Sequence, residues 1–121
     1  MTKEYNIAEK SILDLEQDLI KQTYVVYDKG AEWAKAQAEF EQLEDLKHTV
    51  LAQSMNGEGS IASQETEARA SKLFMDHLKG LSEARHKALV AKVAYVSSQN
   101  KYDALRTILS NKRETVKRGI S

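Results

Sequence analysis

Mostly apolar residues recur along this chain at alternating intervals of three and four residues, over residues 12–50 and again over residues 74–116. An average spacing of about 3.5 residues is typical of helices that pack along a seam. The first stripe consists of Ile12, Leu15, Leu19, Gln22, Val26, Lys29, Trp33, Ala36, Phe40, Leu43, Lys47 and Val50. The second consists of Phe74, His77, Leu81, Ala84, Ala88, Ala91, Tyr95, Ser98, Tyr102, Leu105, Leu109, Lys112 and Val116.

The two stripes predict two helical arms joined by a turn. We expect an N-terminal arm over about 6–55, a turn at 56–62 that contains Gly57 and Gly59, and a C-terminal helix over about 63–118. Ser63 is the expected N-cap of the second arm, and Gly119 suits the position after its last turn. The last turns of this helix hold basic residues, whose positive charge interacts favourably with the helix dipole: Lys112, Arg113, Lys117 and Arg118.

The segment 22–30 is the weakest part of the helical prediction. It is rich in β-branched and aromatic residues between Thr23 and Tyr27, and it ends in Asp28-Lys29-Gly30, which resembles a stop signal. A kink or a short strand is the alternative. Because the heptad phase crosses Gly30 unbroken, we favour a continuous or kinked helix.

Folding the chain back about residue 59 gives an antiparallel hairpin in which position i lies roughly opposite position 118 − i. This relation places Trp33 beside Ala84 and Ala88, and Leu15 near Tyr102. Large residues then face small ones, as a packed seam requires. The predicted fold class is therefore all-α: one domain over 1–121 that forms a long, coiled-coil-like antiparallel helical hairpin.

Each arm also carries apolar residues away from its stripe, which a seam of two helices does not need to bury. They are Leu13, Ile20, Tyr24, Tyr27 and Leu46 on the first arm, and Leu78, Leu89, Val93, Val96 and Ile108 on the second. We expect the chain to self-associate into an oligomeric helical bundle, most simply as a dimer with four helices or otherwise as a higher ring. The predicted oligomer interface consists of Leu13, Ile20, Tyr24, Leu89, Val93 and Val96.

Composition narrows the class of protein. The 121 residues include no cysteine and no proline, and 30% of them are charged. No disulfide or thiolate site is therefore available, and nothing forbids long helices. The first residues lack the pattern of a signal peptide, and the apolar runs are too short to span a membrane. We expect a cytoplasmic protein, in the host cytoplasm if it is phage-encoded, with no membrane partner.

The net charge of zero is a cancellation between two segments. Residues 1–84 hold 9 basic and 16 acidic side chains, a charge of −7, whereas residues 85–121 hold 9 basic and 2 acidic side chains, a charge of +7. A partner responds to the local field rather than to the total. The second arm is therefore the candidate surface for an anionic ligand.

No enzyme motif is present, and we predict a non-enzymatic protein with no catalytic residues, cofactor, metal or small-molecule substrate. The segment Gly57-Glu58-Gly59-Ser60 lacks the preceding strand and following lysine of a phosphate loop, so it is better explained as a turn. His77 with Asp76 would need further ligands from another segment to bind a metal. The preferred interpretation of His48, His77 and His86 is that they lie at the edge of the seam or in solvent.

The basic second arm is the one candidate for nucleic-acid binding. Its predicted contact residues are Lys101, Arg106, Lys112, Arg113, Lys117 and Arg118, and Tyr95 and Tyr102 lie on the same arm. Lysine and arginine neutralise phosphates, and tyrosines can stack on bases. The competing interpretation is that the tyrosines belong to the seam and that the bases complement the helix dipole and the acidic residues Asp14, Glu16 and Asp18 of the facing arm.

The layout resembles that of the UvsY-type recombination mediators, a family of small phage proteins. The resemblance covers residues 30–118 and rests on the aromatic, acidic segment 31–44 (AEWAKAQAEFEQLE), the turn with its glycines, and the basic segment 101–113 (KYDALRTILSNKR). It implies an all-helical, oligomeric protein that binds single-stranded DNA and helps to load a recombinase. The family carries a basic Lys-x-Arg element before its turn, where this chain has Ala52-Gln53-Ser54.

Two functions are therefore expected from the sequence. The first is an accessory role in phage-type DNA recombination or replication, in which the self-associated chain contacts single-stranded DNA through its basic C-terminal helix. Its partners would be the DNA and a recombinase or replication protein. The alternative is an oligomeric coiled-coil adaptor or scaffold that binds a protein and has no role with nucleic acid.

Overall fold

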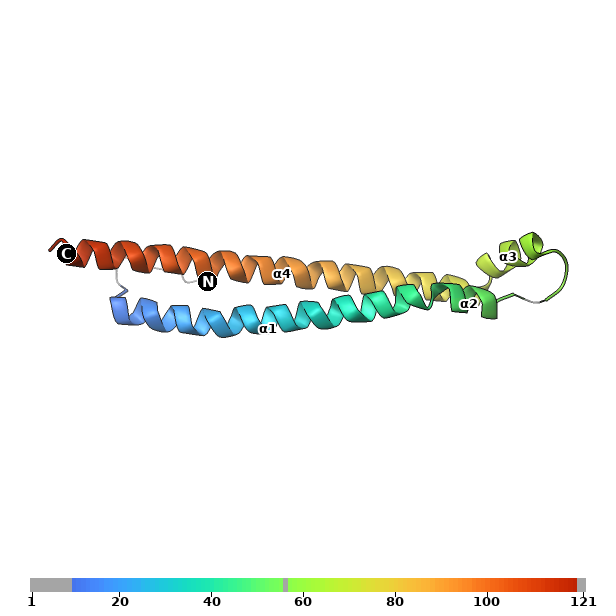
Figure 1. The fold of residues 1–121 in the computed structure, drawn as a ribbon, viewed down its shortest axis with the longest axis horizontal. Coiled ribbons are helices and arrows are strands. Elements are labelled where there is room, and N and C mark those ends of the chain that lie inside the picture. The colour runs from blue at the N-terminus through green and yellow to red at the C-terminus, as the bar shows by residue number, and fades with distance from the viewer. Residues whose placement is uncertain (1–9, 56, 120–121) are drawn as a thin grey trace, which may run out of the picture. The chain divides into compact units, whose positions relative to one another are not determined.

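The computed structural model of the chain describes residues 10–55 and 57–119, and every regular element in these ranges is an α-helix. The helices are α1 (Ile12–Asp45), α2 (Lys47–Gln53), α3 (Ile61–Arg69) and α4 (Lys72–Lys117). The chain is an all-α helical hairpin in which the long helix α1 packs against α4 (Figure 1). The predicted fold class is confirmed.

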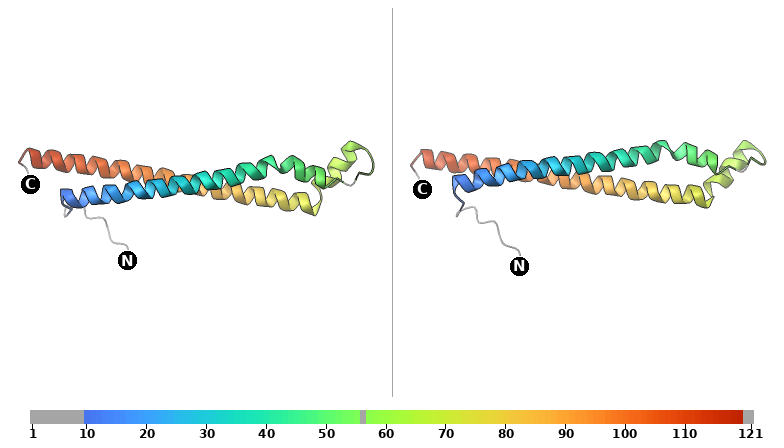
Figure 2. Two further views of the ribbon diagram at one scale, coloured as in Figure 1. Left: turned by 60° about the horizontal axis from the view of Figure 1, so that its bottom comes forward. Right: turned by 90° about the horizontal axis from the view of Figure 1, so that it is seen from below.

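The contacts divide the chain into two compact units, and α1 and α4 contribute to both. Among the described residues, unit 1 comprises 10–30 and 93–119, and unit 2 comprises 31–55 and 57–92. In unit 1, the first part of α1 and the last part of α4 lie side by side and run in opposite directions in all views (Figures 1 and 2). Unit 2 holds the rest of α1 and α4 together with α2 and α3, and these two short helices contact each other.

The predicted stripes form the interior of both units. All of their residues are at least partly buried except Lys47 and Val116. The most buried residues of unit 1 are Leu15, Gln22, Ser98, Leu105 and Leu109, and those of unit 2 are Ala36, Ala68, Phe74, Leu81 and Ala88. The 3.5-residue period therefore identified the packed face of each long helix.

The segment 22–30 is an uninterrupted part of α1, which confirms the helical interpretation over a strand. Gln22 is buried, and its Nε2 donates a hydrogen bond of 2.9 Å to the Ser98 carbonyl. Gly30 allows a close approach, because a Cβ atom there would lie 3.1 Å from Cε2 of Tyr95. The residue that resembles a helix stop thus makes room for an aromatic ring.

The pairing of the two arms differs from the predicted relation. Gln22 hydrogen bonds to Ser98, two residues beyond the predicted position 96, and His77 lies against the Leu43 carbonyl, two residues beyond the predicted position 75. The returning arm contains the segment 54–60 and a break at 70–71, which a symmetric turn does not include. These extra residues shift the partners on α4 toward higher numbers.

Helix ends also differ in part from the prediction. The second arm begins with α3, whose N-cap is Ser60 rather than Ser63: Ser60 Oγ accepts a hydrogen bond from the Ser63 N–H at 3.1 Å. At the far end of α4 the prediction is confirmed. Gly119 has a φ of +71°, a conformation that glycine adopts without steric cost, and its N–H donates to the Val116 carbonyl at 3.0 Å.

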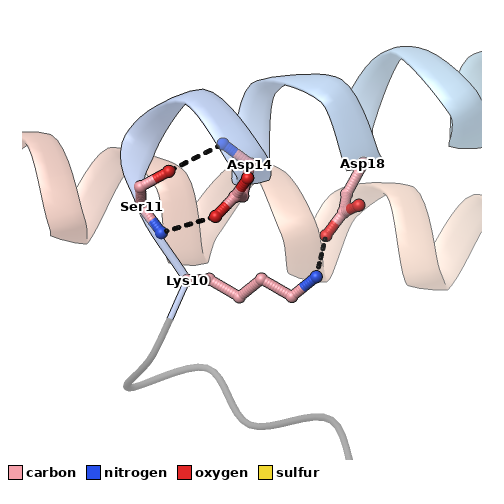
Figure 3. A network of polar contacts seen from close by, with 4 residues as sticks. All are labelled: Lys10, Ser11, Asp14 and Asp18. Carbon is pink, nitrogen blue, oxygen red and sulfur yellow. Dashed lines mark hydrogen bonds and ion pairs between the residues drawn. The ribbon is translucent and has the colours of Figure 1, made fainter.

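The first turn of α1 is closed by a capping box (Figure 3). Ser11 Oγ accepts a hydrogen bond from the Asp14 N–H at 3.1 Å, and Asp14 Oδ2 accepts one from the Ser11 N–H at 3.2 Å. Lys10 Nζ lies 3.4 Å from Asp18 Oδ2 one turn further on. Hydrogen bonds from the Ser11 side chain and then its backbone lower the pKa of Asp14 below the ordinary value of 3.8, and Lys10 adds to this effect.

This depressed pKa predicts a dependence of stability on pH. A carboxyl group whose pKa is lower in the folded state stabilises that state above its unfolded pKa, and the contribution disappears as the pH falls through the folded pKa. We therefore expect wild type to unfold at higher urea concentration than Asp14→Asn at pH 7, and the difference to shrink as the pH falls below about 4. Urea titrations at several pH values measure this, and a difference that grows on acidification would contradict it.

Candidate functional site

Four basic residues of α4 line one edge of its seam at multiples of seven residues: Arg85, Lys92, Arg106 and Arg113. In unit 2, the Arg85 guanidinium lies 5.3 Å from the centre of the Phe40 ring, and Lys92 Nζ lies 5.8 Å from that of Trp33. In unit 1, Arg106 lies 6.0 Å from the centre of the Tyr102 ring. The side chains of Arg85, Lys92 and Arg106 thus cover aromatic rings at the seam, which is a packing role.

The six residues predicted to contact nucleic acid all lie in unit 1, five on the last part of α4 and Arg118 directly after it, but they differ in their surroundings. Arg113 is 3.4 Å from Glu16 on α1, and Arg118 is 3.1 Å from Glu114 in the last turn of α4. Lys112 is partly buried on the seam. Lys101 and Lys117 are exposed, and the described part of the chain offers neither of them an ion-pair partner.

Fewer acidic residues of α1 form ion pairs with the basic arm than the sequence predicts. Of the three expected to face it, Glu16 pairs with Arg113, whereas Asp14 caps α1 and Asp18 pairs with Lys10. The described residues of unit 1 hold nine basic and six acidic side chains, a net charge of +3. Packing of α1 against the C-terminal arm thus lowers the local positive charge, but the net charge of unit 1 remains positive.

A surface groove in unit 1 lies among these residues. Its lining includes Leu19 of α1 and Tyr102, Arg106, Leu109 and Arg113 of α4, with polar side chains between them. Tyr102 is partly buried there, and Arg106 lies over its ring. Tyr95 is also partly buried, and its hydroxyl accepts a hydrogen bond of 2.9 Å from Gln99 Nε2. Both tyrosines belong to the seam, which favours the packing interpretation over base stacking.

Large apolar side chains are exposed on the outer face of α1 in unit 1. Leu13, Ile20, Tyr24 and Tyr27 are 64%, 58%, 68% and 76% exposed. Together with Gln17 they occur at alternating intervals of four and three residues, so they form a second stripe on the side of α1 away from the α4 seam. We call this set the outer stripe of α1.

The predicted interface residues of α4 are exposed as well. Val93 and Val96 of unit 1 are 67% and 42% exposed, and Leu89 of unit 2 is 56% exposed. Of the ten apolar residues that the sequence places off the seam, only Leu78 and Ile108 are partly buried. The prediction that these side chains need a cover is therefore consistent with their exposure, although self-association itself stays a prediction.

Histidines and acidic residues form no metal site in the ranges that the structure describes. His77 Nε2 lies 3.0 Å from the Leu43 carbonyl, so its N–H donates to the backbone of the facing helix in unit 2. This agrees with the interpretation of His77 as a residue at the seam edge. A second groove lies in unit 2. It is lined by Glu44, Asp45, Lys47, His48, Leu81 and Arg85.

Comparison of the chain with models of protein families, with curated protein sequences and with solved structures finds no match. The resemblance to the UvsY-type mediators accordingly remains a prediction from the sequence pattern. Among the described helices, none is both long enough and apolar enough to cross a membrane.

Proposed function

We propose that this protein is a non-enzymatic coiled-coil adaptor or scaffold that self-associates and presents helical faces to a protein partner. The observation that carries the proposal is the outer stripe of α1, whose large side chains are more than half exposed although they repeat at helical spacing. Burial of apolar surface stabilises association by about 25 cal/mol per Å². A row of such residues on one helix is typical of a face that receives another helix.

The scattered exposure of single apolar residues would not support this proposal, because folded proteins expose many of them. What distinguishes Ile20, Tyr24 and Tyr27 is their order: they are separated by four and then three residues on one face of α1. The buried seam of the same helix uses the same spacing. The proposal therefore assigns the outer stripe the same task as the seam, with the partner supplied by another chain.

Affinity capture with purified protein tests the adaptor function. We expect the wild-type chain to retain a protein from an extract of its native cell after nuclease treatment, and Tyr24→Glu, which separates the self-associated chains that present the binding faces, to lose it. Thr107→Glu, which adds the same charge at an exposed position of α4 outside the stripe, serves as the matched control and should retain the protein. Equal capture by all three would contradict the assignment of the surface.

A second candidate function is the accessory role in DNA recombination or replication, in a cytoplasmic setting. It is supported by the net charge of unit 1 and by the exposed ammonium groups of Lys101 and Lys117, which have no partner among the described residues. Phosphate contacts from these lysines and from their neighbours Arg106, Lys112, Arg113 and Arg118 would supply the affinity. A recombinase or replication protein would then be the protein partner.

Fluorescence anisotropy with a labelled single-stranded oligonucleotide tests this second function. Binding through phosphates should weaken steeply between about 50 and 200 mM salt, because counterions are released. Lys101→Glu combined with Lys117→Glu should weaken it at low salt, whereas the same number of charge reversals at exposed Lys72 and Lys79 of unit 2 should not. An absence of binding at low salt would leave the adaptor function alone.

A further inference from the structure

The outer stripe of α1 carries a charge pattern along one edge that complements itself. Lys21 and Asp28 are seven residues apart, so they lie on the same side of the apolar row formed by Ile20, Tyr24 and Tyr27. Both charged residues are exposed, and neither side chain has a hydrogen bond or ion pair within the part of the chain that the structure describes. Two opposite, unpaired charges thus border the most exposed aromatic pair of unit 1.

An antiparallel neighbour of identical sequence satisfies both charges at once. In antiparallel coiled coils, residues on equivalent edges of the two helices face each other across the seam. If Tyr24 packs against Tyr27 of the second copy, the same alignment brings Lys21 opposite Asp28 of that copy. The two-fold symmetry then repeats each contact, so that two ion pairs flank a centre of four tyrosines.

We propose that the outer stripe of α1 is a self-recognition surface on which a second copy of this chain docks antiparallel, with its two-fold axis between Val25 and Val26. This inference rests on the proposed self-association and specifies its geometry. The occupant is a second copy rather than another protein, because the surface is complementary to itself in both apolar pattern and charge.

The charges also select one alignment among those that keep the apolar stripes together. Sliding the two helices by one heptad in one direction brings Lys21 opposite Lys21 of the second copy, and sliding them in the other brings Asp28 opposite Asp28. Like charges opposite each other are destabilising. The favoured alignment is therefore the one in which both contacts between Lys21 and Asp28 are attractive.

A parallel pair of α1 helices would not bring Lys21 and Asp28 opposite each other. In that arrangement Lys21 faces Glu16, which already lies 3.4 Å from Arg113, and Asp28 faces Thr23. A parallel pair would thus compete with a contact that holds α1 against α4 and would leave Asp28 unpaired. The charge pattern favours the antiparallel arrangement.

Charge reversal tests the proposal in the full-length chain. Lys21→Glu places a carboxylate opposite Asp28 of the second copy, and Asp28→Lys places an ammonium opposite Lys21. We expect each single variant to raise the dissociation constant of the dimer about tenfold at low salt, measured by sedimentation equilibrium. The double variant K21E/D28K should restore it, and an equimolar mixture of the two single variants should associate as a heterodimer.

The matched controls are Lys79→Glu and Asp76→Lys, which change the net charge equally at exposed positions of α4 in unit 2. They should leave the dissociation constant unchanged. Circular dichroism establishes that each single variant is folded, and association of the mixed variants provides an independent check. Loss of self-association that neither the double variant nor the mixture reverses would overturn the proposal.

Cysteine crosslinking distinguishes the two helix directions, since the chain has no cysteine of its own. We expect a disulfide to form faster in a mixture of Tyr24→Cys and Tyr27→Cys than in either variant alone. A parallel pair would instead crosslink each variant to itself. That result would exclude the antiparallel arrangement.

The outcomes separate this inference from the broader proposal. A wild-type chain that remains monomeric at all concentrations would remove the self-association of the proposed function along with its geometry. A wild-type dimer that is unaffected by reversals at Lys21 and Asp28 would overturn only the antiparallel docking of the outer stripe. The exposed valines Val93 and Val96 of α4 would then be the next surface to test.

Discussion

Replacing Phe74 with alanine will lower the free energy of unfolding by about 3–4 kcal/mol, the usual cost of removing a buried aromatic side chain. Phe74 is 3% exposed. The other buried positions of unit 2 are Leu81 and three alanines, Ala36, Ala68 and Ala88. Few large side chains are therefore available to fill the cavity that the ring would leave.

Urea denaturation followed by circular dichroism measures the effect of Phe74→Ala. The matched control is Leu73→Ala, because Leu73 is the preceding residue of α4 and is 53% exposed. It should change the free energy of unfolding by less than about 0.5 kcal/mol. Equal losses in the two variants would show that Phe74 does not occupy the interior of unit 2.

The second large effect is expected at Gln22, where Gln22→Glu will destabilise the protein by about 3 kcal/mol at pH 7. Gln22 is 5% exposed, and its amide donates to the Ser98 carbonyl at 2.9 Å. The substitution replaces this donor with a carboxylate oxygen that faces a carbonyl oxygen. A buried, unpaired charge against an acceptor is among the most costly changes that a protein interior can undergo.

The loss at position 22 will depend on pH in a defined direction. Burial raises the pKa of the introduced carboxyl above its unfolded value, and its protonated form can again donate to the Ser98 carbonyl. The variant should therefore recover stability as the pH falls toward the unfolded pKa of about 4.3 and lose it as the pH rises through the raised folded value. Urea titrations from pH 4 to pH 8 follow this recovery.

The control for this experiment is Gln22→Leu, which has no titrating group. Because the Ser98 carbonyl also accepts the regular hydrogen bond within α4, loss of the amide leaves it with a partner. We expect a change of less than about 1.5 kcal/mol, with no dependence on pH over the same range. A comparable loss at pH 7 in both variants would show that shape, and not charge, determines the cost at this position.

The sequence was sufficient to predict which face of each long helix is buried. The seam positions from Ile12 to Leu43 and from Phe74 to Lys112 are all at least partly buried, because a period of 3.5 residues has few physical causes other than helix packing. The same reasoning separated the seam from residues such as Leu13 and Tyr27, which the structure leaves exposed.

The pairing of the arms could not be predicted in the same way. Sliding one helix by seven residues keeps both stripes in contact, so the heptad pattern alone does not fix the alignment. The alignment depends on how many residues the connection uses, and this chain inserts α3 and a break at 70–71 there. The observed contacts are shifted by two residues from the predicted relation as a result.

The candidate site was predicted only in part. The basic side chains were found, but the packing of Arg85 and Lys92 over aromatic rings was missed, although their seven-residue spacing along the seam edge was a usable signal. The pair Ser11 and Asp14 likewise has the spacing of a capping box. The accessibility of the Lys101 and Lys117 ammonium groups could not be predicted, because it depends on where the carboxylates of the facing helix lie. Their positions follow from the alignment of the two helices.

The distribution of aromatic residues gives the two units different spectroscopic labels. The single tryptophan of the chain, Trp33, belongs to unit 2, under the ammonium group of Lys92, whereas the described tyrosines Tyr24, Tyr27, Tyr95 and Tyr102 all belong to unit 1. Indole emission will therefore report on the melting of one unit and phenol absorbance on that of the other. A single denaturation experiment can thus reveal, without an added dye, whether the two halves of the hairpin open together or in turn.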